Sequence, residues 1–302
     1  MMQIDEWLKR LQSDGLPVLR QTTLEFARLA LHGESVAIPE LAAAVLHDPL
    51  MTLKVLHDAN SRHASRLGTE ITSVEHAIMM LGVTSFFKHF QTQRTIENYL
   101  VDNPHALTKL LSVISCCHHA AFQSWNWAVM RNDIKAEEIY IAAFLHDLPE
   151  MLLWLLASDQ MIQIEDSRRH MGLSAQEAQQ QVLGFTLDQL QPPLLQKWGF
   201  PEHLYDMMCI PNATNPRTQL VHLAVAVARH SRWGWYGSAL ENDFEAIAAL
   251  LHHPLDEIVS LIHRNAVAAA RQEERYGVTP AAAWLPMLPG DWPDDPAGLT
   301  SF

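Results

Sequence analysis

Histidine is the residue type that stands out for possible chemistry in this sequence of 302 residues, which contains 17 histidines. The tripeptide Leu-His-Asp occurs three times, at positions 46–48, 56–58 and 145–147. An adjacent imidazole and carboxylate could both bind one cation, and a bound cation can activate water. Each pair therefore has to be judged by the secondary structure in which it lies.

The first two pairs are explained more simply as helix boundaries. Asp48 precedes a proline, which is typical of a residue that caps the start of a helix. Asp58 is followed by Ala-Asn-Ser, where we expect a helix to end. We therefore interpret His47-Asp48 and His57-Asp58 as helix-boundary residues rather than ligands.

Two histidines are predicted to point into the core. Apolar residues precede His146 at helical spacing, at positions 139, 142 and 143, so its helix should bury it. His118 lies in a similar apolar stripe between Leu111 and Val129. Spacing alone leaves open whether these are metal ligands or hydrogen-bonded core histidines.

Composition excludes several classes of function. The 21 Lys and Arg residues against 34 Asp and Glu residues give a net charge of −13, which argues against direct binding of nucleic acid or an anionic membrane. No apolar run approaches the ~20 residues that a membrane span needs, and the N-terminus does not resemble a secretory signal. The three cysteines form no disulfide framework. We expect a cytoplasmic protein.

Helix start signals recur along the chain and predict an all-α protein of thirteen to fifteen short helices. The segments 72–75 and 174–177 have the form of a capping box. Residues 276–302 contain five prolines and cannot continue a helix. Because Trp284 and Trp292 lie in this tail, we expect it to pack back on the body, and a partner-binding segment is the alternative.

Several motifs together resemble the HDOD family, the HD-related output domain of bacterial signalling proteins. The resemblance covers about residues 10–265 and rests on the Ile-Pro-Glu-Leu-Ala, Asp-Pro, Ala-Asn-Ser and Thr-Ser-x-Glu-x-Ala-Ile-x-x-Leu-Gly elements. Later segments continue it in the order that the family shows. The matching segments are residues 38–42, 46–52, 56–61, 71–82, 144–149, 183–185 and 195–202.

The resemblance implies a multi-helical domain related to HD phosphohydrolases. It implies an N-terminal helical lobe over 1–104 and an HD-like helical lobe over 105–275, followed by the irregular tail 276–302. Enzymes of the HD type hold metal through a histidine, a His-Asp pair and a later aspartate. His118, His146 and Asp147 correspond to the first three of these residues.

The sequence departs from that pattern at several positions. Val225 occupies the place of the later aspartate, Leu187 stands where related proteins often carry a histidine, and residues 209–211 are Cys-Ile-Pro where metal-binding relatives have paired histidines. Pro-Glu follows the His-Asp pair in place of Gly-Lys. Three ligands leave a divalent cation one donor short. The substitute donors to consider are His222, His203 and Asp206.

The leading hypothesis is that the protein is a non-enzymatic signalling module with a vestigial HD site. Under this hypothesis we expect no cofactor. It would act through an unidentified signalling protein or a small ligand, using exposed aromatic residues among Trp233, Trp235, Trp284 and Trp292, although we expect at least two of these in the core. The alternative is a phosphohydrolase that binds a divalent transition metal through His118, His146 and Asp147. Regulation of nucleic acid by recruitment is a weaker third reading, and the sequence leaves the oligomeric state open.

Overall fold

Several helices of this protein begin at a capping side chain that the sequence predicts. In the computed structural model, which describes residues 4–11, 15–67, 70–209 and 214–286, Asp48 Oδ1 accepts hydrogen bonds from the N–H groups of Leu50 and Met51. Ser174 and Glu177 form the predicted capping box. The described residues contain no strand, so the protein is all-α as predicted, with one isolated parallel bridge between Val18 and Thr95.

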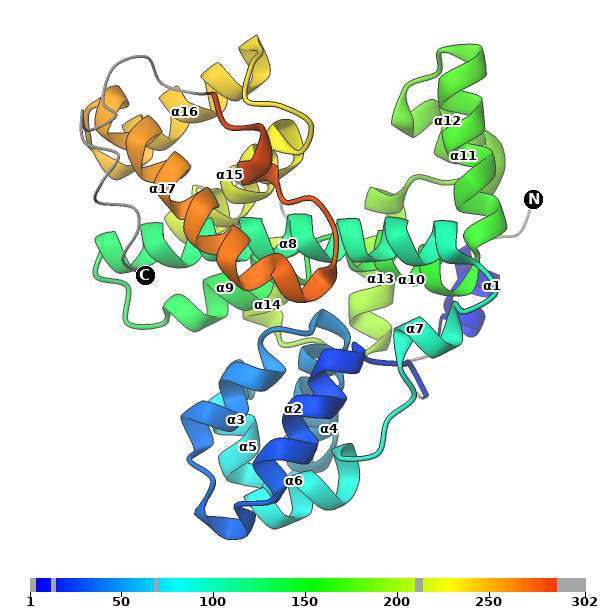
Figure 1. Ribbon diagram of the computed structural model, residues 1–302, viewed down its shortest axis with the longest axis vertical. Coiled ribbons are helices and arrows are strands. Elements are labelled where there is room, and N and C mark those ends of the chain that lie inside the picture. Colours follow the sequence, from blue (N-terminus) through cyan, green and yellow to red (C-terminus); the bar gives the residue numbers. More distant parts are fainter. Residues whose placement is uncertain (1–3, 12–14, 68–69, 210–213, 287–302) are drawn as a thin grey trace, which may run out of the picture.

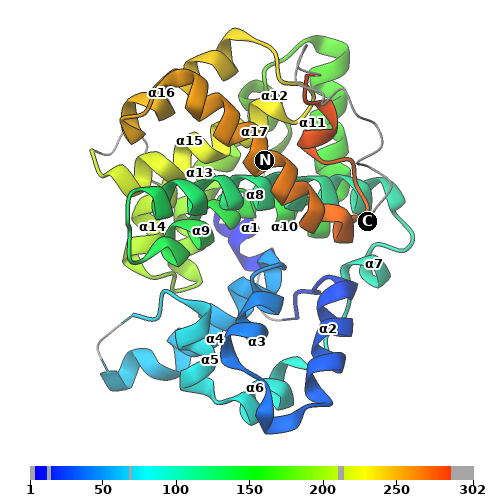
Figure 2. The same ribbon diagram turned by 60° about the vertical axis from the view of Figure 1, so that its left-hand side comes forward.

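The helices form two lobes, one below the other in Figure 1. The lower lobe contains α2 (Arg20–Ala30), α3 (Ile38–Val45), α4 (Pro49–Leu67), α5 (Val74–Leu81) and α6 (Val83–Phe90), with a short 3₁₀ helix at Gly33–Ser35. The α7 helix (Ile96–Tyr99) lies at the junction, as Figure 2 shows.

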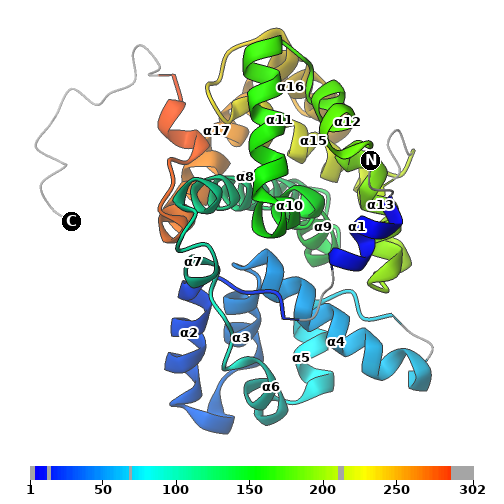
Figure 3. The same ribbon diagram turned by 90° about the vertical axis from the view of Figure 1, so that its right-hand side faces the viewer.

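The upper lobe is built around the long α8 helix. Its helices are α8 (Pro104–Met130), α9 (Ala136–Phe144), α10 (Leu148–Leu156), α11 (Ser158–Met171), α12 (Ala175–Leu183), α13 (Leu187–Lys197), α14 (Glu202–Cys209), α15 (Pro216–Ser231), α16 (Ser238–Leu251) and α17 (Leu255–Glu273), followed by 3₁₀ helices at Glu274–Tyr276 and Ala281–Trp284. The α1 helix (Ile4–Arg10) packs on α13 (Figure 3), with the ring of Trp7 edge-on to Phe185.

One apolar core extends through both lobes. In the lower lobe, Phe26 and Phe86 are fully buried with their ring centroids 5.4 Å apart. In the upper lobe, the largest buried side chains are Trp127, Trp154 and Phe144, from α8, α10 and α9. Burial of large aromatic side chains contributes strongly to stability, so this core fixes the helices that carry the candidate site.

Hydrogen bonds from tyrosines join the lobes at the end of α3. The hydroxyl groups of Tyr140 and Tyr276 donate to the backbone carbonyls of Leu46 and His47, both over 2.9 Å. Carbonyls at a helix C-terminus lack partners within their own helix, so these hydroxyls satisfy groups that would otherwise need water. Tyr276 is buried, which shows that the first residue of the predicted tail packs on the body.

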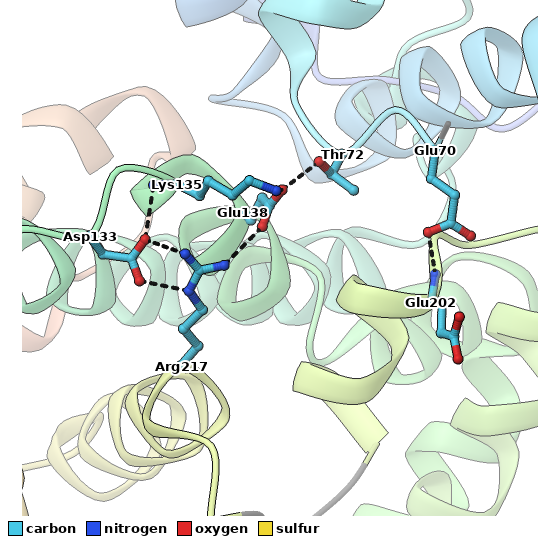
Figure 4. Close-up of polar contacts among 7 residues, drawn as sticks. All are labelled: Glu70, Thr72, Asp133, Lys135, Glu138, Glu202 and Arg217. Atoms are coloured by element: carbon cyan, nitrogen blue, oxygen red, sulfur yellow. Dashed lines mark hydrogen bonds and ion pairs between the residues drawn. The ribbon is translucent and has the colours of Figure 1, made fainter. Parts of the chain in front are cut away.

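A second set of polar contacts joins the segment 70–74 to the upper lobe (Figure 4). Thr72 Oγ1 donates to Glu138 Oε1 over 2.6 Å, and the backbone N–H of Glu202 donates to Glu70 Oε2 over 2.9 Å. Glu138 is buried and also pairs with Lys135 at 3.0 Å and with Arg217 at 3.4 Å. The connection between α4 and α5 is therefore attached to the first turns of both α9 and α14.

Three local predictions were wrong. The described residues contain seventeen α-helices rather than thirteen to fifteen, and α8 alone has 27 residues. The α4 helix continues to Leu67, because the side chain of Asn60 bonds the carbonyls of Leu56 and Ile71 instead of ending the helix. Ser73, not Thr72, caps α5, and the Thr72 hydroxyl is used between the lobes.

One segment among the described residues has the length and apolar composition of a membrane span. It is Ala136–Leu156, with a mean hydropathy of 1.4. In the structure it is divided into α9 and α10 by the turn that contains His146 and Asp147, and 83% of its apolar window is buried inside the protein. These two helices are packed as core helices of the upper lobe.

Candidate functional site

The turn between α9 and α10 positions the His-Asp pair. The α9 helix ends at Phe144 and α10 begins at Leu148, so both residues of the pair lie in the turn between two buried helices. His146 and Asp147 are 8% and 7% exposed, in agreement with the prediction that His146 points inward. The Nδ1 atom of His146 lies 3.0 Å from Asp147 Oδ1.

An arginine from α15 occupies the other side of the aspartate. Arg229 bonds both carboxylate oxygens of Asp147, with Nη2 on Oδ1 and Nε 3.4 Å from Oδ2. Burial by itself would raise the pKa of Asp147, but Arg229 and the bond to His146 outweigh burial and hold the pKa below its usual value. Arg229 lies one helical turn beyond Val225, the position at which the resemblance to HD-type enzymes would place an aspartate.

This arrangement does not fit a metal ion. Both oxygens of Asp147 are bonded to a guanidinium group, and His146 directs Nδ1 to the same carboxylate. A divalent cation at Asp147 would lie beside the positive charge of Arg229, which repels it. Across the four described ranges, no group of three or more His, Cys, Asp or Glu side chains is arranged to hold a metal.

The structure places His118 in different surroundings from the His-Asp pair. His118 is only 1% exposed on α8, and its ring centroid lies 5.7 Å from that of Tyr276 and 6.1 Å from that of His47. His118 therefore contributes to the packing of α8 against the end of α3. The cysteines just before it, Cys116 and Cys117, have raised pKa values because they are buried and because the charge of Asp147 adds to that effect.

Only one of the three substitute donors lies beside the pair. The ring of His222 is perpendicular to that of His146, with the centroids 5.4 Å apart, and burial lowers the pKa of His222 to about 4. His203 is exposed on α14. Asp206 is on the same helix, where burial and the charge of Asp206 raise the pKa of Cys209 to about 12. Neither His203 nor Asp206 lines the cavity described next.

A cavity of about 370 Å³ opens beside the pair. Its lining residues come from the α9–α10 turn and from α13, α14 and α15, and they are His146, Asp188, Gln191, Pro192, Met208, Cys209, His222 and Arg229. Gln191 is buried, and its Nε2 atom has no hydrogen-bond partner among the residues that the structure describes. The cavity therefore offers imidazole, amide, carboxylate and guanidinium groups beside the apolar side chains of Pro192 and Met208, which suits a small polar ligand.

Sequence reasoning missed Arg229, Asp188 and Gln191. A signal for Arg229 was present, because His222, Val225 and Arg229 are spaced by three and four residues and share one face of a helix. Nothing in the local sequence indicates that this face meets the α9–α10 turn, since Arg229 and Asp147 are 82 residues apart.

Comparison with known proteins gives the family. The sequence pattern of the HDOD domain matches residues 16–213. Among curated proteins there is no significant match. Several solved structures share the fold at 19–20% sequence identity.

A virulence factor from Campylobacter jejuni superposes with a TM-score of 0.64 at 20% identity, covering 88% of this chain and 96% of that one. The MmoQ response regulator from Methylococcus capsulatus gives 0.57 at 19% identity, covering 79% and 98%. An HDOD domain protein with unknown function from Geobacter sulfurreducens gives 0.51 at 19% identity, covering 91% and 99%. With the match over residues 16–213, the chain belongs to the HDOD domain family.

Proposed function

We propose that this protein is a non-enzymatic signal-transduction module of the bacterial cytoplasm that acts through contacts with a signalling protein or a small ligand. The observation that carries the proposal is the pairing of Arg229 with both oxygens of Asp147. A response regulator among the solved structures of this fold supports a role in signalling. The net charge of −13 supports partners other than nucleic acid or an anionic membrane.

The ion pair gives the proposed absence of catalysis a physical basis. Hydrolysis of a phosphoester by an HD-type site depends on a metal that polarises the phosphoryl oxygen and lowers the pKa of a bound water. The guanidinium of Arg229 neutralises Asp147, but it has no open coordination position for water. The pair therefore keeps the buried carboxylate compensated and removes its ability to activate a nucleophile.

The proposal places a small ligand in the cavity beside this pair. The alternative, a metal-dependent phosphohydrolase, is favoured only by His222, whose imidazole lies next to His146. For that alternative, Arg229 would have to leave Asp147, because it bonds both oxygens of the carboxylate.

The test is hydrolysis of phosphoesters by the full chain. We expect p-nitrophenyl phosphate and bis(p-nitrophenyl) phosphate to be hydrolysed no faster by the native protein than by a variant carrying His146→Ala and Asp147→Ala, with Mn²⁺, Fe²⁺ or Zn²⁺ present. Hydrolysis by the native protein that this variant lacks would overturn the proposal. A second variant, with Val225→Asp and Arg229→Ala, should bind Mn²⁺ or Zn²⁺ more tightly than the native protein in calorimetric titration.

A further inference from the structure

A groove of about 610 Å³ lies between α15 and α16, which pack against each other (Figure 2). Both helices supply its apolar lining, which consists of Pro216 and Leu223 on α15 and of Ala246, Ala249 and Leu250 on α16. Pro216 and Leu223 are seven residues apart, so this lining extends about 10 Å along α15. Ala246 and Ala249 are exposed, and their small side chains leave space over α16. The groove is therefore elongated and apolar along most of its length.

Arg131, the residue directly after α8, lies at one end of this groove. Its Nη1 atom donates to the carbonyl of Leu250 over 2.7 Å, and this bond holds the guanidinium at the last turn of α16. Arg131 and Pro216 also line a neighbouring cavity together, which places the arginine near the first turn of α15. Within the part of the chain that the structure describes, Nε and Nη2 of Arg131 make no hydrogen bond. The edge of the guanidinium that can bind both oxygens of a carboxylate is therefore open.

The charge of the groove favours an anionic group beside Arg131. Among the described residues that line the groove, Arg131 is the one with a permanent charge and none is Asp or Glu. The acid nearest to Arg131 in the sequence, Asp133, is bonded through both oxygens to Arg217, so its charge is compensated (Figure 4). His252 adds an imidazole beside Leu250. In a chain with a net charge of −13, a groove without acidic side chains and with an arginine at one end is complementary to an anion.

The charged and apolar parts of the groove lie at opposite ends. Arg131 is at the last turn of α16, whereas Ala246 is one turn earlier on that helix and Leu223 is two turns beyond the start of α15. We infer that the groove binds a medium-chain fatty acid, with its carboxylate on the Nε–Nη2 edge of Arg131 and its alkyl chain against Ala246 and Leu223.

This site is separate from the cavity beside the His-Asp pair, although His222 lines both. The fatty acid contacts neither His146 nor Arg229, because neither residue lines the groove. The inference therefore goes beyond the proposed function and does not depend on a ligand in that cavity.

The test is calorimetric titration of the full chain with octanoate, at two temperatures so that binding without heat at one temperature is detected at the other. We expect about one octanoate per chain, because the groove has one arginine. Arg131→Ala should weaken the binding by about tenfold or more, since it removes a charge-assisted hydrogen bond. Arg264→Ala is the matched control, because Arg264 is exposed on α17 and lines a different cavity, and it should leave the affinity unchanged.

A second variant, Ala246→Phe, fills the apolar part of the groove without changing its charge. Because Ala246 is exposed, thermal unfolding of this variant should match that of the native protein, while octanoate binding should be lost. Octanol, which lacks the charge, and acetate, which lacks the chain, should both bind the native protein at least about tenfold more weakly than octanoate.

No binding of octanoate by the native protein would overturn the inference. An affinity that Arg131→Ala or Ala246→Phe leaves unchanged would also overturn it, as would equal affinities for octanol and octanoate. Binding of many octanoate molecules per chain would show adsorption instead of a site. Since none of the variants changes the His-Asp pair or Arg229, each of these outcomes leaves the proposed function standing.

Discussion

Arg229 reaches from α15 to the turn between α9 and α10 and bonds both carboxylate oxygens of Asp147. The aspartate is buried, so its charge needs a compensating partner. Val225, one turn earlier on the same helix, is the position at which the resemblance to HD-type enzymes would place a later aspartate. In this chain that position is apolar, and the arginine one turn away forms an internal ion pair with Asp147.

Removal of this arginine should destabilise the protein. Arg229→Ala leaves the carboxylate of Asp147 buried beside His146 alone, and loss of one partner of a buried pair is costly. Because the Arg229 side chain is 48% exposed, we expect a decrease of only about 1–3 kcal/mol in the free energy of unfolding. Urea denaturation of the native and variant proteins measures it. The exposed pair of Arg28 with Glu40 is the control, and Arg28→Ala should cost less than ~1 kcal/mol. Equal costs for the two variants would contradict the account.

Acid should weaken the fold between about pH 6.5 and pH 3. Burial, with Arg275 and His118 nearby, lowers the pKa of His47 to about 3, and burial with His146 and Arg229 lowers that of His222 to about 4. Unfolding restores ordinary values near 6.5, so the unfolded state binds protons that the folded state excludes. The stability that both histidines contribute is complete above pH 6.5 and is lost as the pH falls toward the folded-state values, by up to about 1.4 kcal/mol per pH unit for each proton.

Urea denaturation at several pH values measures this slope in the native protein and in His47→Gln. The variant should lose less stability between pH 6.5 and pH 4, because one of the excluded protons is gone. A slope that the substitution leaves unchanged would show that His47 does not exclude a proton.

Asp48 should matter for stability and not for chemistry. It is fully buried and accepts four hydrogen bonds, from the N–H groups of Leu19, Leu50 and Met51 and from the Thr22 hydroxyl. Asp48→Ala removes the cap of α4 and strands buried donors, so we expect a loss of about 3 kcal/mol or more in thermal or urea unfolding. Asp58→Ala, which breaks ion pairs with the exposed Arg62 and His89, should cost less than ~1 kcal/mol. A small effect at Asp48 would contradict its structural role.

The lobe contacts around Glu138 should be separable by substitution. Thr72→Val removes the hydrogen bond to Glu138 and should cost about 1 kcal/mol. Glu138→Gln keeps an acceptor for Thr72 but removes the charge that faces Lys135 and Arg217, and should cost more. Hydrogen exchange should show faster opening of residues 70–81 in the Thr72 variant, with no change at α12. Uniform acceleration across both lobes would contradict a local contact.

Features set by neighbouring residues were predictable from the sequence. The Ser174 capping box and the cap by Asp48 both depend on residues within one turn of each other, and the structure contains both. Motif order also predicted the HDOD domain, which matches residues 16–213. Local side-chain chemistry therefore predicted these helix starts, although it failed at Asn60 and Thr72, and the order of motifs predicted the family.

Features that depend on contacts between distant helices were not predictable in the same way. The bond of Arg229 to Asp147 needs the packing of α15 beside the α9–α10 turn, and the contact of His118 with His47 needs the docking of the two lobes. Of the four tryptophans considered, Trp235 is buried, Trp233 and Trp284 are exposed, and Trp292 lies outside the described residues. A single sequence gives no signal that separates the buried tryptophan from the exposed ones. Trp235 bonds the carbonyl of Ala281, which is 46 residues away, and local sequence does not indicate such a contact.

The metal content of the purified full chain tests the central claim most directly. The protein should be prepared without a histidine tag and without added metal or chelator, next to His146→Ala. The account predicts far less than one iron, manganese or zinc per chain, and the same low content in the variant, because Arg229 already compensates Asp147. A near-stoichiometric metal that disappears in His146→Ala would contradict the account and would identify the His-Asp pair as a working metal site.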